Sequence, residues 1–165
     1  MDRLTTRGLT LSLKASGLTK GTTSTYTTTA TTEGFINGKH VTGLAAQTNT
    51  ATPTTDVATG AAFVALTDNQ ATVLVIGQNL AGAIKMCQGT IEATEVGVTT
   101  TAGAFLKAPQ FPSLPDDFMP LGYLLVRTAP SASDFTAGTS SWTATGITAS
   151  AVVEVAVLPD RPQTS

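Results

Sequence analysis

The stretch Ala71–Ile91, ATVLVIGQNLAGAIKMCQGTI, decides the fold that the sequence predicts. Its first part, Ala71–Ile76, ends in an unbroken run of valine, leucine and isoleucine, which is typical of a strand buried on both faces. The connection Gly77–Gly82 has a glycine at each end and the length of a hairpin loop. A second strand is expected over Ala83–Ile91, so the stretch predicts the core hairpin of a β-protein.

Two other apolar runs, Leu121–Thr128 and Ala151–Leu158, are expected to pair with this hairpin. Glu154 is the sole charge in the second run and is expected to point outward. Weaker strand-like pieces alternate with turns and loops: Asn37-Gly38 is the strongest turn signal, and Gln47–Thr59 is expected to be a loop. No helical periodicity persists beyond a few residues. The pattern predicts an all-β fold: a single β-sandwich or jelly-roll-like domain with an extended N-terminal arm.

The expected arm covers residues 1–34, and the expected sandwich body covers residues 35–165. Leu9, Leu11 and Leu13 alternate with polar residues, which favours one short strand. The threonine tract that follows can extend but holds too little apolar area to fold alone. We therefore expect the arm to order on a neighbouring subunit or on the body of its own domain; a floppy terminus is an equal alternative.

A proline-rich passage separates the hairpin from the second apolar run. Its four prolines are expected to prevent regular strand pairing and to hold the chain extended. Three large apolar residues within it can pack the loop onto the sheet. The prolines are Pro109, Pro112, Pro115 and Pro120, and the apolar anchors are Phe111, Leu114 and Phe118.

The composition restricts the classes of function. Charged residues make up 12% of the chain, the net charge is −2 and the pI is about 5.2, so no electrostatic footprint for nucleic acid appears. Threonine supplies about a fifth of the residues, which suits neutral polar strand surfaces. So few charges protect a monomer poorly from self-association, which favours a surface covered by partner subunits. No window reaches the ~20 apolar residues of a membrane helix and no secretory signal is recognisable, so we expect a soluble protein without a membrane partner.

No constellation of residues indicates catalysis. His40 is the only histidine and accompanies no nucleophile motif such as G-x-S-x-G. Cys87 is the only cysteine, which excludes an intrachain disulfide and favours a small buried side chain. Asp116 and Asp117 are adjacent carboxylates beside a proline, which favours a turn. We therefore expect no enzyme, no catalytic residues, no cofactor and no metal site.

The arrangement resembles structural proteins of tailed bacteriophages, in particular capsid decoration (cement) proteins and small head-fibre proteins. The residues that carry the resemblance cover about two-thirds of the chain. They are FINGK at 35–39, TGAAFVALTDNQATVLVIGQNLAGAIKMCQG at 59–89, FPSLPDDFMPLGYLLV at 111–126, and FTAGT with ATGI between 135 and 147.

The resemblance implies a β-rich virion protein, commonly a homotrimer, made in the host cytoplasm and bound to the outside of the capsid. Its partners would be the major capsid protein and further copies of itself, and its work would be to stabilise the shell. The arm Met1–Thr32 and the loop Phe111–Pro120 are the expected contact surfaces. The contact residues that we single out are Leu9, Leu11, Leu13, Tyr26, Phe111, Leu114 and Phe118.

Two alternatives stay open at this point. One is a tail, baseplate or receptor-binding fibre component, because Thr/Gly/Ala-rich β-structure is common to all of these. The other is a carbohydrate-binding module, for which Trp142, Tyr26 and Tyr123 would be the stacking candidates.

Overall fold

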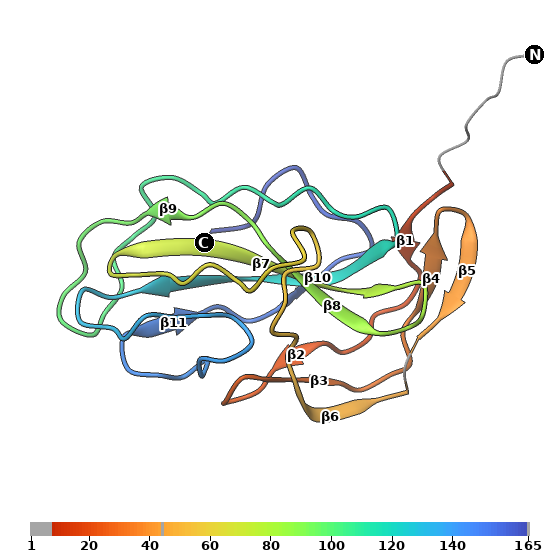
Figure 1. Cartoon of the computed structure of the whole chain (residues 1–165), viewed down its shortest axis with the longest axis horizontal. Helices are drawn as coiled ribbons and strands as arrows, with labels where there is room; N and C mark the ends of the chain where they lie inside the picture. The colour runs from red at the N-terminus through yellow and green to blue at the C-terminus, as the bar shows by residue number, and fades with distance from the viewer. Residues whose placement is uncertain (1–7, 44, 165) are drawn as a thin grey trace, which may run out of the picture.

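The computed structural model describes residues 8–43 and 45–164. Within these ranges the chain has no helix, and its twelve strands form three antiparallel sheets. Figure 1 shows how the labelled strands are arranged. The all-β prediction is confirmed, whereas the sandwich or jelly-roll arrangement stays a prediction. The strands are β1 Leu11–Ser12, β2 Thr19–Lys20, β3 Thr25–Thr28, β4 Glu33–Ile36, β5 Lys39–Thr42, β6 Gln47–Ala51, β7 Gln70–Asn79, β8 Ile84–Gln88, β9 Glu92–Ala93, β10 Phe118–Thr128, β11 Ile147–Ala149 and β12 Val153–Glu154.

The predicted core hairpin is β7 and β8, and it lies in a sheet of order β11-β10-β7-β8. The hairpin is confirmed, but the expected turn was placed too early. Strand β7 continues through Gly77 to Asn79, and β8 begins at Ile84. Gly77 is therefore a strand residue and not a turn residue. It allows close packing against the neighbouring strand β10, because a Cβ at this position would overlap the carbonyl oxygen of Met119.

Strand β10 pairs with β7 along most of its length, as the sequence predicts. The last apolar run behaves differently. Only Val153–Glu154 forms a strand, and it pairs with β10, not with the core hairpin. The prediction that Ala151–Leu158 joins the hairpin was therefore wrong, because β10 occupies that edge of β7.

Pro120 lies inside β10, where regular pairing was not expected. A β-bulge accommodates it: the pairing passes from Pro120 with Gly77 to Gly122 with Ile76, which leaves Leu121 as the extra residue. Bulges are one of the few places in a sheet that tolerate proline. The expectation that all four prolines prevent pairing was therefore wrong at this position.

Both faces of the central sheet are buried, and each face has its own apolar cluster. Along β7, Leu74 and Ile76 face one cluster, and Val73 and Val75 face the other. The proline-rich loop and the C-terminal segment cover the Val73 face. The other face is covered by apolar side chains of the N-terminal strands and of two later loops: Leu18, Tyr26, Ile36, Val41, Phe63, Leu66, Phe135 and Trp142.

The N-terminal strands form two small sheets, of order β1-β4-β5 and β2-β3-β6. The Asn37-Gly38 turn joins β4 to β5 with φ angles of 51° and 74°, which confirms the turn prediction. The segment expected to be a loop at 47–59 begins with strand β6, so that expectation was wrong there. The expected boundary between residues 34 and 35 falls inside β4. Of the alternatives for the arm, its described part orders on the body of its own chain.

Candidate functional site

Two of the titratable residues singled out in the sequence, His40 and Asp116, lie at the surface. His40 is exposed, with Nε2 3.0 Å from Glu33 Oε1 and its ring against Phe35. Asp116 is exposed, and its backbone carbonyl accepts a hydrogen bond from the Asn37 side chain at 2.7 Å. No group of three His, Cys, Asp or Glu side chains within residues 8–43 and 45–164 is placed to hold a metal ion.

Over the same ranges no helix is long and apolar enough to cross a membrane.

Cys87 lies in β8 with no solvent exposure. Burial raises the pKa of its thiol to about 12, and the nearby Asp56 carboxylate acts in the same direction. Because nucleophilic attack by cysteine requires the thiolate, this site is unreactive near neutral pH.

An apolar groove of about 380 Å³ lies beside the N-terminal strand. It runs between the end of the proline-rich loop, the first residues of β10 and the C-terminal segment. Six apolar side chains form most of its lining: Leu114, Pro115, Phe118, Pro120, Val157 and Leu158. The remaining lining residues are Gly8, Thr10, Asn37 and Asp116, so among the described residues the charge that lines the groove is negative.

The N-terminal strand is fastened to the rim of this groove. The amide of Gly38 donates to the carbonyl of Leu9 at 3.0 Å, and the amide of Asn37 donates to Thr10 Oγ1 at 3.0 Å. Gly8 packs flat against this turn, because a Cβ at that position would overlap the backbone of Asn37. The first described residues are therefore held in a fixed position on the groove wall.

The contact residues expected in the N-terminal arm fall into two groups. Leu9 and Leu13 are exposed, at 63% and 51% of their surface, and Leu11 between them is partly buried. Tyr26 is only 3% exposed and belongs to the core cluster. The first three can take part in a contact, whereas the tyrosine stabilises the fold instead.

The contact residues expected in the proline-rich loop pack onto the sheet. Phe111 meets the ring of Tyr123 edge to face at 5.0 Å between centroids. Leu114 and Phe118 join the same apolar cluster, and both also line the groove. Phe118 is 2% exposed, so it supports the groove wall more than it presents a surface of its own.

Sequence reasoning missed the contribution of the C-terminal segment. Val157 and Leu158 were assigned to a strand that pairs with the core hairpin, yet Val157 is 56% exposed and both line the groove. The prolines at 159 and 162, which end the apolar run, were the available signal that strand pairing stops early.

Glu154 lies at the surface, as expected, but its carboxylate is engaged. Its Oε1 accepts hydrogen bonds from the amide of Ser16 at 2.8 Å, from the hydroxyl of Ser16 at 3.0 Å and from the amide of Leu18 at 3.0 Å. The last strand therefore holds the N-terminal segment in place. Nothing in the local sequence around Glu154 indicates this contact, which joins residues far apart in the chain.

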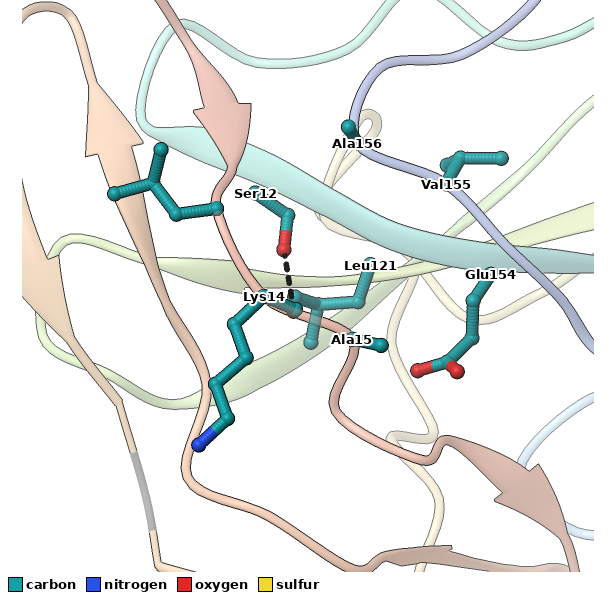
Figure 2. A pocket seen from close by; sticks show the side chains of 8 residues that line it. Ser12, Lys14, Ala15, Leu121, Glu154, Val155 and Ala156 are labelled. Atoms are coloured by element: carbon teal, nitrogen blue, oxygen red, sulfur yellow. Dashed lines mark hydrogen bonds between the residues drawn. The ribbon is translucent and has the colours of Figure 1, made fainter.

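A second, smaller pocket of about 180 Å³ lies beside this contact, as Figure 2 shows. It separates residues 12–15 from residues 154–156, and Leu121 of β10 lies between the two segments. The amide of Ser12 donates to the carbonyl of Ala156 at 2.9 Å, which joins the segments at one end. The side chain of Lys14 points away from Glu154, so the pocket has no converging polar groups that would fix a ligand.

The aromatic residues considered for sugar stacking are all in the core. Trp142, Tyr26 and Tyr123 are 2%, 3% and 1% exposed. The indole Nε1–H of Trp142 donates to the carbonyl of Thr25 at 3.0 Å. These three side chains therefore offer no platform for a sugar ring.

No protein-family model, curated protein sequence or solved structure matches this chain.

Proposed function

We propose that this chain is a structural protein of a tailed-phage virion, a decoration protein that binds the outside of the capsid as a homotrimer and stabilises the shell. The observation that carries the proposal is the apolar groove with exposed Leu9 and Val157 beside it. A small β-protein that leaves such a surface open favours burying it against another protein subunit. The low share of charged residues, 12%, supports the same conclusion.

A rigid scaffold suits mechanical work of this kind. The central sheet is buried on both faces and the N-terminal sheets pack on it, so contact surfaces are held in fixed positions. The β-sandwich or jelly-roll arrangement is part of this proposal, and the two clusters on opposite faces of the sheet support a layered fold. A protein that binds only the assembled shell stabilises it over its dissociated state by mass action.

Three copies joined in one trimer would bind the capsid more tightly than a single copy. Each copy would contribute a modest contact with the major capsid protein, and linked contacts multiply through effective concentration. The proposal therefore needs no large single interface. It requires no catalytic residue, cofactor, nucleic acid or membrane.

The location is tested by labelling intact particles. Antibodies against the purified chain are applied to tailed-phage particles produced from the genome that encodes it, and electron microscopy shows where they bind. We expect labelling over the whole head. Labelling confined to tails, baseplates or fibres would replace the proposal by its alternative, and particles without label would overturn both.

Contact by the surface around the groove is tested by two single substitutions of exposed leucines. Leu9→Ser removes an apolar side chain next to the groove, and Leu80→Ser removes a 43% exposed leucine from the β7–β8 turn. We expect about a tenfold lower capsid occupancy at limiting protein for Leu9→Ser, the equivalent of roughly 1.4 kcal/mol, and no change for Leu80→Ser. Equal occupancy of both variants would remove the surface around Leu9 from the contact.

Deletion of the whole arm would give no clean test of this contact. Removal of residues 1–32 would take Leu18 and Tyr26 out of the core cluster and would expose the central sheet. Loss of binding would then report unfolding, and for this reason the test uses surface substitutions.

A further inference from the structure

A small pocket lies beside Arg127, at the opposite end of β10 from the groove. Its volume is about 130 Å³, and its lining comes from Phe105, the end of β10, the region of β11 and the C-terminal residues Gln163 and Thr164. Among the described residues that line it, Arg127 is the only one with a charged side chain. The pocket therefore places one positive charge against a space that holds about four water molecules.

Two contacts hold the guanidinium of Arg127 in place. Its Cζ atom lies over the ring of Phe105, 4.9 Å from the ring centroid. Its Nη1 atom donates a hydrogen bond to the backbone carbonyl of Gly103 at 2.8 Å. A cation that is held both over an aromatic face and by a hydrogen bond has little rotamer freedom left to lose. A ligand would therefore meet a guanidinium that is already positioned.

The charge of Arg127 has no acidic partner in the described part of the chain. The two ion pairs within residues 8–43 and 45–164 are His40–Glu33 and Lys107–Glu92. The Gly103 carbonyl is neutral and engages one of the five N–H groups of the guanidinium. Because Arg127 is half-buried, it has lost part of its hydration, and an anion in the pocket would compensate for that loss.

The other walls of the pocket favour one class of anion. Phe105 and Leu125 are apolar, whereas Thr148 and Gln163 are polar. A sulfate or phosphate would turn oxygens toward the apolar walls, where no hydrogen-bond donor meets them. A carboxylate on a short aliphatic stem can place both oxygens on the guanidinium and its carbons against those walls. The volume is also below the roughly 300 Å³ of ordinary ligand pockets, which limits the occupant to a few non-hydrogen atoms.

We propose that this pocket, the Arg127 pocket, binds one short aliphatic carboxylate. The carboxylate has two sources with the same chemistry: a free small acid, or the side chain of a glutamate or aspartate in a partner chain. In both cases the two oxygens accept hydrogen bonds from the free N–H groups of Arg127. The inference goes beyond the proposed function and is independent of the trimer and of the location on a capsid.

Propionate tests the proposal, because it is the side chain of glutamate without the backbone. Nuclear magnetic resonance spectra of the full chain follow the amide signals and the Nε–H signal of Arg127 during the titration. We expect saturable shifts at Arg127, Thr148 and Gln163, with a dissociation constant on the order of 1 mM for so small a ligand. Propionamide has the same shape without the charge and is expected to cause none of these shifts.

Two variants and a matched control connect the shifts to the pocket. Arg127→Gln removes the charge and is expected to weaken propionate binding at least about tenfold. Arg161→Gln makes the same change at an exposed arginine that does not line the pocket, and should bind as the wild type does. Circular dichroism establishes that all variants are folded.

The second variant leaves Arg127 and its contacts in place. Thr148 is exposed and lies directly opposite Arg127 in the β10–β11 pair, so Thr148→Glu puts a carboxylate beside the guanidinium. We expect this variant to lose propionate binding, since its own carboxylate occupies the pocket. The result does not depend on whether Arg127→Gln folds.

A glutamate with both ends blocked, N-acetylglutamate α-methylamide, distinguishes the two sources. Binding equal to that of propionate assigns the pocket to a side chain of a partner chain, and binding of propionate alone assigns it to a free acid. Absence of saturable shifts with propionate, equal shifts with propionamide, or unchanged binding to folded Arg127→Gln or Thr148→Glu would overturn the inference. Tighter binding of sulfate than of propionate would overturn the choice of a carboxylate.

Discussion

At the scale of single residues, polar contacts fasten the N-terminal segment to the sheet. Glu154 does so with one carboxylate oxygen, which accepts three hydrogen bonds from Ser16 and Leu18. The amides it serves lie in a bend between β1 and β2, where no strand partner is available to them. Loss of the carboxylate would leave these donors to water or unpaired.

Substitution of Glu154 tests the strength of this contact. Glu154→Ala removes the acceptor and is expected to lower the free energy of unfolding by about 1–2 kcal/mol, because hydrogen bonds to charged groups are worth more than neutral ones but this side chain is exposed. Glu154→Gln keeps an oxygen at the same place and should lose less than half as much. Urea denaturation measures both. Equal stability of the alanine variant and the wild type would contradict the role of the carboxylate.

Cys87 allows a chemical test of the core. Its thiol has a pKa of about 12 against an ordinary value of 9.0, so at any pH below 9 its thiolate fraction is about a thousandfold lower than that of a free thiol. A thiol reagent at pH 8 is expected to react at least a thousandfold more slowly with the folded chain than with the chain in urea. Comparable rates would show that β8 opens readily.

The same thiol has a defined effect on stability against pH. The pKa of the folded state is raised, so the contribution of the protonated thiol is fully present below pH 9 and is lost as the pH rises from 9 toward about 12. Over that window the wild type is expected to lose stability more steeply than Cys87→Ala. The difference between the two variants isolates the thiol, since every other titrating group is common to both.

At the scale of elements, the β7–β10 pair depends on glycine at two positions. Gly77 lies opposite Pro120, and Gly122 follows the bulge, where a Cβ would come within 2.9 Å of the carbonyl oxygen of Val153. The bulge shifts the side-chain alternation by one residue, so residues before and after it can serve different faces of the sheet. Met119, before the bulge, accordingly faces one apolar cluster, and Tyr123, four residues later, faces the other.

Gly77→Ala tests this close approach. The added Cβ would overlap the Met119 carbonyl and the Phe118 ring, so we expect a loss of at least about 2 kcal/mol in the free energy of unfolding. Gly60→Ala is the control: that glycine has φ +73° but open space around it, and only the backbone strain of about 1 kcal/mol applies. Chemical denaturation compares the two. A smaller loss for Gly77→Ala than for Gly60→Ala would contradict the packing of β7 on β10.

At the scale of the whole molecule, the N-terminal sheets and the central sheet share one core. Leu18, Tyr26 and Ile36 pack in the same cluster as the side chains of β7 and β10. Trp142 joins the later loops to β3 through its hydrogen bond with Thr25. Residues 8–34 are therefore part of the folded unit, although their sequence resembles a free arm.

This shared core predicts a single unfolding transition. Trp142 is 2% exposed between the N-terminal strands and the rest of the chain, so its fluorescence reports their separation. We expect the fluorescence transition in urea to coincide with the transition of the β-sheet signal in circular dichroism. An earlier fluorescence transition would indicate that the N-terminal sheets detach before the central sheet unfolds.

The sequence by itself determined the elements whose signal is local. The apolar run of β7 predicted a strand buried on both faces, because no polar side chain interrupts it. Asn37-Gly38 predicted its turn, because both residues adopt positive φ at low cost. The candidate groove was only partly predictable: Leu114 and Phe118 were named from their place in the proline-rich loop, whereas Val157 was not.

The tertiary structure alone decided what depends on contacts between distant residues. Tyr26 lies in a threonine tract with too little apolar area to fold alone, and it is buried because the central sheet provides the missing surface. From the sequence Glu154 is a surface charge, and only the fold brings Ser16 within hydrogen-bond distance of its carboxylate. From the sequence Pro120 is expected to interrupt strand pairing, but a β-bulge lets it pair with Gly77 of β7. In each case the stabilising partner is far away in the chain, and periodicity within one segment carries no information about it.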